Sequence, residues 1–199
     1  MRIGVFANIF PSLPETFVFD QVSHLLGAGH DVRVYARTTN FESSVGDAFG
    51  RLPGLKERTR GLFRAHRRRR DHAGNILKGA LHACRSGAMA RQFARCLASE
   101  GLSGTGSFRE SLSLLSEAGG YSPVPEFDVL IAHFGATGIV AERLRSAGVF
   151  SGKLVVYFHG CGVSTFMERE SYRKRIPRVL EKADAVIGVS SWVEERLLD

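Results

Sequence analysis

The chain has 199 residues, of which 44% are hydrophobic and 24% are charged, as is ordinary for one soluble globular domain. The net charge is +7, and no apolar run approaches the roughly 20 residues that a membrane-spanning helix requires. Three cysteines without CxxC spacing argue against a disulfide framework and a cysteine-based zinc site. The cytoplasm is therefore the expected compartment.

The first 36 residues predict a strand, a helix and a second strand. Residues 2–7 form a short apolar run, which we interpret as a strand and not as a signal peptide. From Glu15 apolar residues recur at helical spacing until the "GAGH" of residues 27–30, whose glycines favour a helix end. Residues 31–36 alternate as a strand does. Strand, helix and strand in this order form a βαβ unit, and such units build parallel sheets.

Residues 38–126 interrupt this pattern and carry the positive charge. Between residues 51 and 95 there are thirteen Lys or Arg residues and two acidic residues, so the rest of the chain is mildly acidic. Gly- and Ser-rich breaks surround the basic stretches, which are predicted to be helical. We expect a single domain with a scaffold formed by residues 1–37 and 127–199 and a basic helical insertion at about 38–126.

The alternation of strands and helices resumes at Phe127. Because the strands are near-continuous apolar runs, helices should cover both faces of the sheet. The expected fold class is α/β, an open, doubly wound, mostly parallel sheet with the basic helical insertion after the second strand. The predicted strands are 127–135, 153–160 and 183–190, and the predicted helices are 136–148 and 191–198.

Polar side chains gather at the carboxyl ends of these strands, where open α/β sheets bind their ligands. Asn8 follows the first strand, Glu15 and Thr16 begin the first helix, and His133 and His159 end two later strands. Two histidines and one acid at a single edge predict a polar ligand site, although a histidine at a strand end is often only structural. The chain lacks GxGxxG in the first turn and lacks GxxxxGK[ST] throughout, which disfavours a dinucleotide fingerprint and a P-loop.

Four segments in chain order carry a family resemblance: "FPSLPETFVFDQVSHLLGAGHDVRVYA", "FDVLIAHFG", "VVYFHGCGVS" and "ADAVIGVSSWVEERLLD". Together they resemble the Rossmann-like N-terminal domain of GT-B glycosyltransferases, in the family 4 branch that builds exopolysaccharides such as colanic acid. The resemblance covers residues 1–37 and about 127–199. It implies the acceptor-binding half of a retaining, metal-independent enzyme. Such an enzyme moves a sugar from a nucleotide-sugar, its co-substrate, to a polysaccharide or lipid-linked saccharide, without any other cofactor.

The resemblance also assigns expected roles to single residues. His159 matches the histidine of the family's H-G-x-D motif and is the expected catalytic residue, because a neutral imidazole can stabilise charge that develops on a sugar. Gly162 and Ser190 are expected at the edge that faces the donor. In two departures from the family pattern, Gly162 replaces an Asp and Pro14 replaces a Ser, and no metal ligands are expected. The expected acceptor-binding residues are Asn8, Glu15, Thr16, His133, Gly135 and Gly160.

The family's donor-binding carboxylates belong to a C-terminal half that this sequence does not contain. We therefore expect the isolated chain to be inactive in sugar transfer. One alternative is a non-catalytic binding or interaction domain of the same fold. Another is a basic α/β protein associated with nucleic acid.

The segment "RGLFRAHRRRRDH" (60–72) holds six arginines. It is interpreted as a solvated helix face or as a patch for an anionic membrane surface, where each basic residue contributes on the order of 1 kcal/mol. Nucleic acid is an unlikely partner because the segment lacks regularly interleaved aromatic residues. The resemblance favours the membrane interpretation, since such transferases often use lipid-linked acceptors at the inner membrane face. The candidate anion patch is Arg67, Arg68, Arg69 and Arg70.

Overall fold

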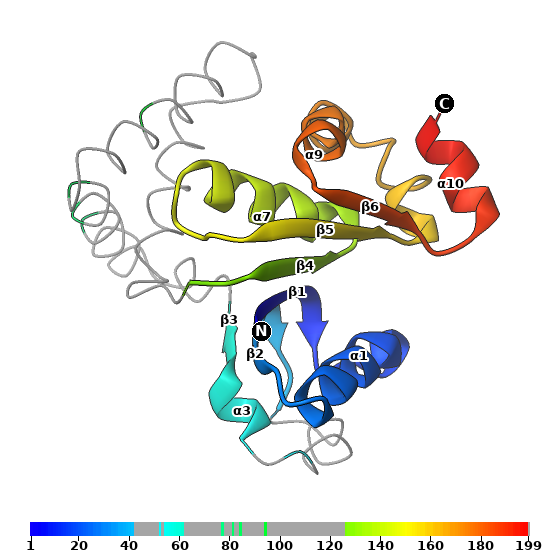
Figure 1. The fold of residues 1–199 in the computed structure, drawn as a ribbon. Coiled ribbons are helices and arrows are strands. Elements are labelled where there is room, and N and C mark those ends of the chain that lie inside the picture. The colour runs from blue at the N-terminus through cyan, green and yellow to red at the C-terminus, as the bar shows by residue number, and fades with distance from the viewer. Residues whose placement is uncertain are drawn as a thin grey trace.

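The computed structural model describes residues 1–41, 52, 54–61, 77, 81, 84, 94 and 126–198. In this part of the chain, six strands form one parallel sheet in the order β3-β2-β1-β4-β5-β6 (Figure 1). The order runs outward from β1 in both directions, as in Rossmann-type sheets. This arrangement confirms the predicted α/β class. The strands are β1 (Arg2–Phe10), β2 (Asp31–Thr39), β3 (Thr59–Gly61), β4 (Val129–His133), β5 (Lys153–Phe158) and β6 (Ala185–Gly188).

Helices cover both faces of the sheet, with α1 on one side and α7 and α9 on the other (Figure 1). Side chains alternate along β1, so that Val5 belongs to the same core cluster as Val18 of α1, while Phe6 belongs to that of Leu144 of α7. Both faces are therefore buried, as the near-continuous apolar strands predict. The described helices are η1 (Leu13–Glu15), α1 (Thr16–Gly27), α3 (Leu55–Arg58), α7 (Gly135–Ser146), η3 (Gly160–Gly162), α8 (Glu170–Arg173), α9 (Ile176–Lys182) and α10 (Ser191–Leu198).

The edge strand β3 was not predicted from the sequence. It pairs in parallel with β2, with Val34 opposite Thr59, and it follows the short helix α3, whose Leu55 is buried in the core on the α1 side. Three residues are too few to show a strand period. The sheet therefore extends into the segment expected to be a helical insertion. Most of that segment lies outside the described residues, so its helical character stays a prediction.

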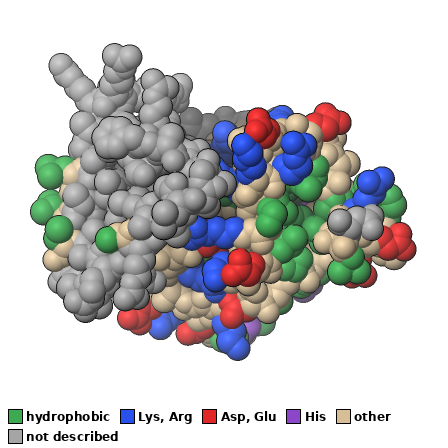
Figure 2. Space-filling view, turned by 90° about the horizontal axis from the view of Figure 1, so that it is seen from above, with side chains coloured by type: hydrophobic (Ala, Val, Ile, Leu, Met, Phe, Trp, Pro, Cys, Tyr) green, Lys and Arg blue, Asp and Glu red, His purple; other side chains and the backbone are tan. Residues whose placement is uncertain are grey.

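The surface of the described residues carries charges of both signs. On the face shown in Figure 2, Lys and Arg side chains lie among Asp and Glu side chains. Exposed pairs such as Lys174 with Glu170 (2.6 Å) and Arg58 with Asp31 (2.6 Å) contribute little to stability. None of the described helices has the length and apolar character needed to cross a membrane.

An ion pair between a buried carboxylate and a half-buried guanidinium joins α7 to α9. The Glu142 carboxylate, in α7, is buried and accepts hydrogen bonds from Arg178 Nε of α9 (3.0 Å) and from Ser146 Oγ (2.6 Å). Removing one partner of such a pair leaves an uncompensated buried charge, which is strongly destabilising. The pair therefore fixes the position of α9 relative to α7.

The turn from β4 into α7 has an unusual backbone. Phe134 has φ 74° and ψ 143°, a conformation that side chains rarely adopt. Thr137 Oγ1 donates to the carbonyl oxygens of His133 and Phe134, which ties the first turn of the helix to the strand end. Gly135 follows, and a Cβ atom there would lie 2.1 Å from Tyr172 Oη and 2.7 Å from Phe158 Cε1. The first turn of α7 can pack this closely only because residue 135 has no side chain.

We predict that Gly135→Ala lowers the free energy of unfolding by about 2–3 kcal/mol, because the added methyl group overlaps packed aromatic rings. The measurement is urea denaturation followed by circular dichroism. Gly27→Ala is the matched control, since Gly27 is also helical and a Cβ atom there meets nothing within 4 Å. Equal stability of the two variants would contradict the packing argument.

Candidate functional site

The structure brings His133 and His159 together at the carboxyl edge of the sheet. His133 is the last residue of β4 and His159 follows the neighbouring strand β5, and their ring centroids are 5.9 Å apart. Phe17 of α1 stacks on His159 at 4.6 Å and lies 5.7 Å from His133, while Phe134 contacts His159 at 4.4 Å. These four residues define the histidine cluster. The two phenyl rings hold the His159 imidazole between α1 and the β4–α7 turn.

Burial and a hydrogen bond to the side-chain amide of Gln21 determine the protonation state and the tautomer of His133. Its side chain is only 3% exposed, and its Nε2–H donates to Gln21 Oε1 at 2.8 Å. Gln21 Nε2 in turn donates to the Tyr157 hydroxyl at 3.4 Å, and the Tyr157 ring stacks on His133. Burial, with a smaller effect from the charge of His159, lowers the pKa of His133 to about 4. At pH 7 His133 is therefore neutral, with its proton on Nε2 and a lone pair on Nδ1.

Three buried polar atoms at this edge have no hydrogen-bond partner. They are His133 Nδ1, His159 Nε2 and Glu15 Oε2, and they make up three of the four such side-chain atoms found among the described residues. Each unsatisfied buried group costs about 1–3 kcal/mol. A ligand hydroxyl can both donate and accept, so it could satisfy a ring nitrogen or a carboxylate oxygen. The cluster thus has the chemistry of a site for a polyhydroxylated ligand.

Glu15 reaches this edge from the start of α1. It is the N-cap residue of that helix, and Thr16, the first helical residue, is exposed. Burial raises the pKa of the Glu15 carboxyl, and a hydrogen bond from the backbone N–H of Ile9 opposes that shift. Burial also lowers the pKa of His159, which favours its neutral form.

The glycines and Ser190 have different surroundings. A Cβ atom at Gly160 would meet only Trp192, at 3.9 Å, whereas Gly162 is buried and its carbonyl oxygen accepts the Tyr172 hydroxyl at 2.9 Å. Gly135 packs against the same tyrosine, so the structure places it in the core. Ser190 Oγ accepts the Val193 N–H at 3.3 Å and caps α10.

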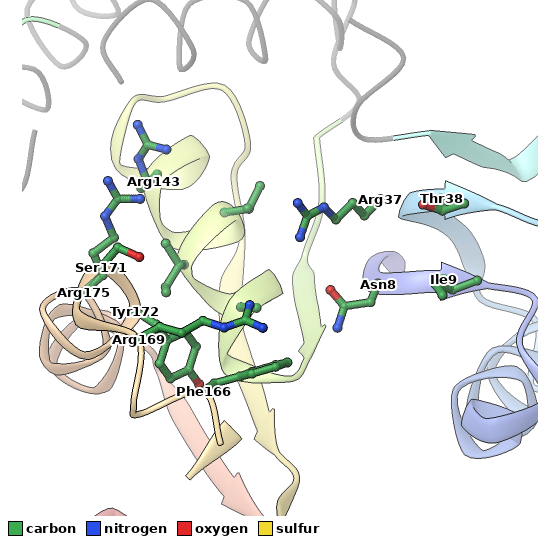
Figure 3. Close-up of a pocket in the computed structure, with 13 residues that line it drawn as sticks. Asn8, Ile9, Arg37, Thr38, Arg143, Phe166, Arg169, Ser171, Tyr172 and Arg175 are labelled. Atoms are coloured by element: carbon green, nitrogen blue, oxygen red, sulfur yellow. The ribbon is translucent and has the colours of Figure 1, made fainter. Parts of the chain in front are cut away.

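Asn8 does not belong to the histidine cluster. It lines a cavity of about 670 Å³ whose described lining residues include neither histidine nor Glu15 (Figure 3). Four arginines line this cavity, and sequence reasoning missed them because each resembles an ordinary surface charge. The predicted patch at Arg67–Arg70 lies outside the described residues. Within the described part of the chain, no group of three or more His, Cys, Asp or Glu side chains could hold a metal ion.

Comparison with known proteins identifies three proteins that are similar to this chain. No family model matches the sequence. The chain is 28% identical over 199 residues to a protein of Salmonella typhimurium named as the colanic acid biosynthesis glycosyltransferase WcaL, with 99% of the chain and 47% of that protein covered. It is 27% identical to the protein of the same name in Escherichia coli (99% and 47%), and 26% identical to the amylovoran biosynthesis glycosyltransferase AmsK of Erwinia amylovora (100% and 47%).

This chain is similar to exopolysaccharide glycosyltransferases. The resemblance inferred from the four sequence segments is thereby confirmed, and the parallel sheet agrees with it. The similarity extends over the basic segment as well, because the matches cover nearly all of the chain. The chain spans about half the length of these relative glycosyltransferases.

The shifted pKa of His133 predicts a pH dependence of stability. Between pH 6.5 and 4 the unfolded chain takes up a proton at residue 133 and the folded chain does not, so the stabilisation present above pH 6.5 is lost as the pH falls. We expect the free energy of unfolding to fall by about 2–3 kcal/mol more in the wild type than in His133→Gln across this window. Urea titrations at several pH values measure this difference, and parallel curves for the two proteins would contradict it.

Proposed function

We propose that this chain is the acceptor-binding part of a glycosyltransferase of exopolysaccharide biosynthesis. The whole enzyme would transfer a sugar from a nucleotide-sugar to a polysaccharide or a lipid-linked saccharide, with retention of anomeric configuration and without a metal. The observation that supports it is the coincidence of two facts. Glycosyltransferases match nearly the whole chain, and the unpaired atoms of His133, His159 and Glu15 lie where a sheet of this type binds its ligand.

In this proposal His159 acts on the sugar at the reacting centre. Its ring is held by Phe17 and Phe134, so little reorganisation is needed when a ligand arrives. A neutral imidazole can exchange hydrogen bonds with sugar hydroxyls, and that contact strengthens as charge develops on the sugar. His133, fixed by Gln21, would accept a hydroxyl of the acceptor through Nδ1.

Gly162 supports one alternative, a non-catalytic binding domain of the same fold. The resembled family carries an Asp at this position. Here the residue is buried, and a Cβ atom would lie 3.3 Å from Tyr172 Oη, so a larger side chain would displace that hydroxyl. A binding domain would keep saccharide affinity and give no transfer in any context.

A chimeric enzyme tests whether the chain is part of a glycosyltransferase or a non-catalytic binding domain. We join this chain to the remaining part of the Salmonella relative and assay transfer from a panel of UDP- and GDP-sugars to a lipid-linked acceptor. In this chimera, His159→Ala should lower kcat by up to about 10²–10³-fold with a smaller change in KM, because the lost contact is strongest in the transition state. His133→Ala should act mainly on the KM of the acceptor.

The 199-residue chain alone is the negative control and should give no product. Turnover by the chain alone would refute its assignment as the acceptor-binding part, and an unchanged kcat in His159→Ala would make that histidine structural. Saccharide binding without transfer by the chimera would favour the non-catalytic domain.

We further propose that the basic segment attaches the protein to the inner membrane face. The thirteen basic residues between positions 51 and 95 would be attracted to anionic headgroups, and Leu62 and Phe63 would bury apolar surface beneath them.

Vesicle sedimentation tests the membrane proposal. Changing Arg67, Arg68, Arg69 and Arg70 to Gln should abolish the salt-sensitive sedimentation with anionic vesicles, while neutral vesicles should bind neither protein. Equal sedimentation of both proteins would leave the segment as a solvated face. Tighter binding to RNA than to vesicles would favour a nucleic-acid partner.

A further inference from the structure

A second candidate site is the cavity lined by Asn8, which we call the arginine cavity. Its arginines come from separate parts of the chain: the end of β2, the last turn of α7, the residue before α8 and the residue before α9. No Asp or Glu occurs among its described lining residues. Guanidinium groups stay protonated and carry several N–H donors, so they bring positive charge and hydrogen-bond donors to the lining. The arginines are Arg37, Arg143, Arg169 and Arg175.

The arginines surround the cavity from different sides. In Figure 3, Arg37 and Asn8 extend toward the open space from β2 and β1, and Arg169 extends toward it from the opposite wall. Arg143 and Arg175 belong to the same side of the cavity in this view. Arginine side chains therefore line the cavity on two walls.

Two of the arginines are held in place by their surroundings. The Arg169 guanidinium lies 5.0 Å from the centroid of the Phe166 ring, a cation–π contact that orients it. Arg143 is 8% exposed, so the surrounding packing holds its side chain in place. Thr38, Asn8 and Ser171 add neutral hydrogen-bonding groups to the lining. The arrangement is preorganised for a small anion with several acceptor oxygens.

We propose that the arginine cavity binds a phosphate or diphosphate group. The planar guanidinium fork matches phosphate oxygens two at a time, which makes arginine the preferred side chain for this group. The volume of about 670 Å³ exceeds what a phosphate needs, and the apolar side chains of Ile139 and Phe166 also line the cavity. The ligand is therefore a phosphorylated molecule whose other part also lies in the cavity.

The position of the cavity suggests how this ligand relates to the histidine cluster. Asn8 and Thr38 lie near the carboxyl ends of β1 and β2. His133 is the last residue of β4 and His159 follows β5, so both sites lie at one edge of the sheet. If the proposed function holds, on which this step rests, the phosphate belongs to the saccharide acceptor. A free sugar phosphate and a lipid-linked diphosphate offer the same chemistry.

The test is isothermal titration of inorganic pyrophosphate into the 199-residue chain at low and physiological salt. We expect saturable binding that salt weakens. Arg37→Gln and Arg169→Gln should each raise Kd about tenfold, as the loss of one charge-assisted hydrogen bond would. Arg173→Gln is the matched control: this residue lies in α8, is exposed and does not line the cavity, so its Kd should stay within about twofold of the wild type.

Absence of saturable binding by the wild type would overturn the proposal, and so would equal affinities of the cavity variants and Arg173→Gln. Arg37 and Arg169 are exposed, so their variants should fold. The circular dichroism spectrum of each variant verifies this. If a Gln variant unfolds, Arg37→Lys and Arg169→Lys replace it, since a point charge cannot bind two oxygens as the fork does.

Two further ligands identify the source of the phosphate. Geranyl diphosphate that binds more tightly than pyrophosphate would assign the cavity to a lipid-linked diphosphate, and glucose 1-phosphate that binds more tightly would assign it to a free sugar phosphate. Pyrophosphate binding by a chain whose chimera transfers no sugar would keep this proposal and refute the proposed function. Sugar transfer by the chimera without any phosphate binding by the chain would refute this proposal and keep the proposed function.

Discussion

The close approach of α7 to the sheet is the constraint on which the rest of the structure depends. The helix begins immediately after β4 because Phe134 adopts a positive φ and because residue 135 has no side chain. Tyr172 and Phe158 occupy the space that a side chain would take. The same turn ends β4 at His133 and places Phe134 against His159. A looser turn would separate α7 from β5 and would also open the histidine cluster.

The carboxyl edge of the sheet holds two environments that differ in charge. Burial lowers the pKa of both imidazoles of the histidine cluster and raises that of Glu15 at the same edge, so each group is biased toward its neutral form. The unpaired atoms of these groups suit the hydroxyls of a saccharide. The arginine cavity carries fixed positive charge, because guanidinium groups stay protonated. Such a division would let one edge recognise the neutral and the anionic parts of a single ligand.

The two halves of the described chain join through aromatic contacts between residues that are distant in sequence. Phe6 and Tyr35 stack at 5.3 Å, and Phe150 meets their rings at 5.5 and 5.2 Å. Such pairs add about 0.5–1.5 kcal/mol beyond the area that they bury. They fix β1 and β2 relative to the segment that follows α7. The edge that carries the candidate sites is therefore assembled from both sides of the basic segment.

The sequence by itself determined the parallel α/β fold, because runs of apolar residues mark the longer strands. It also determined the convergence of His133 with His159, because the carboxyl ends of parallel strands meet at one edge of the sheet. It missed β3, which at three residues is too short to show a period and is held by its pairing with β2. It also missed Gln21 as the partner of His133, and it missed the arginine cavity. Positions 37, 143, 169 and 175 have no common spacing along the chain, and only the packing of α7 and the segment around α8 against the sheet brings them together. Local patterns report periodicity, whereas neighbours across the fold are decided by tertiary packing.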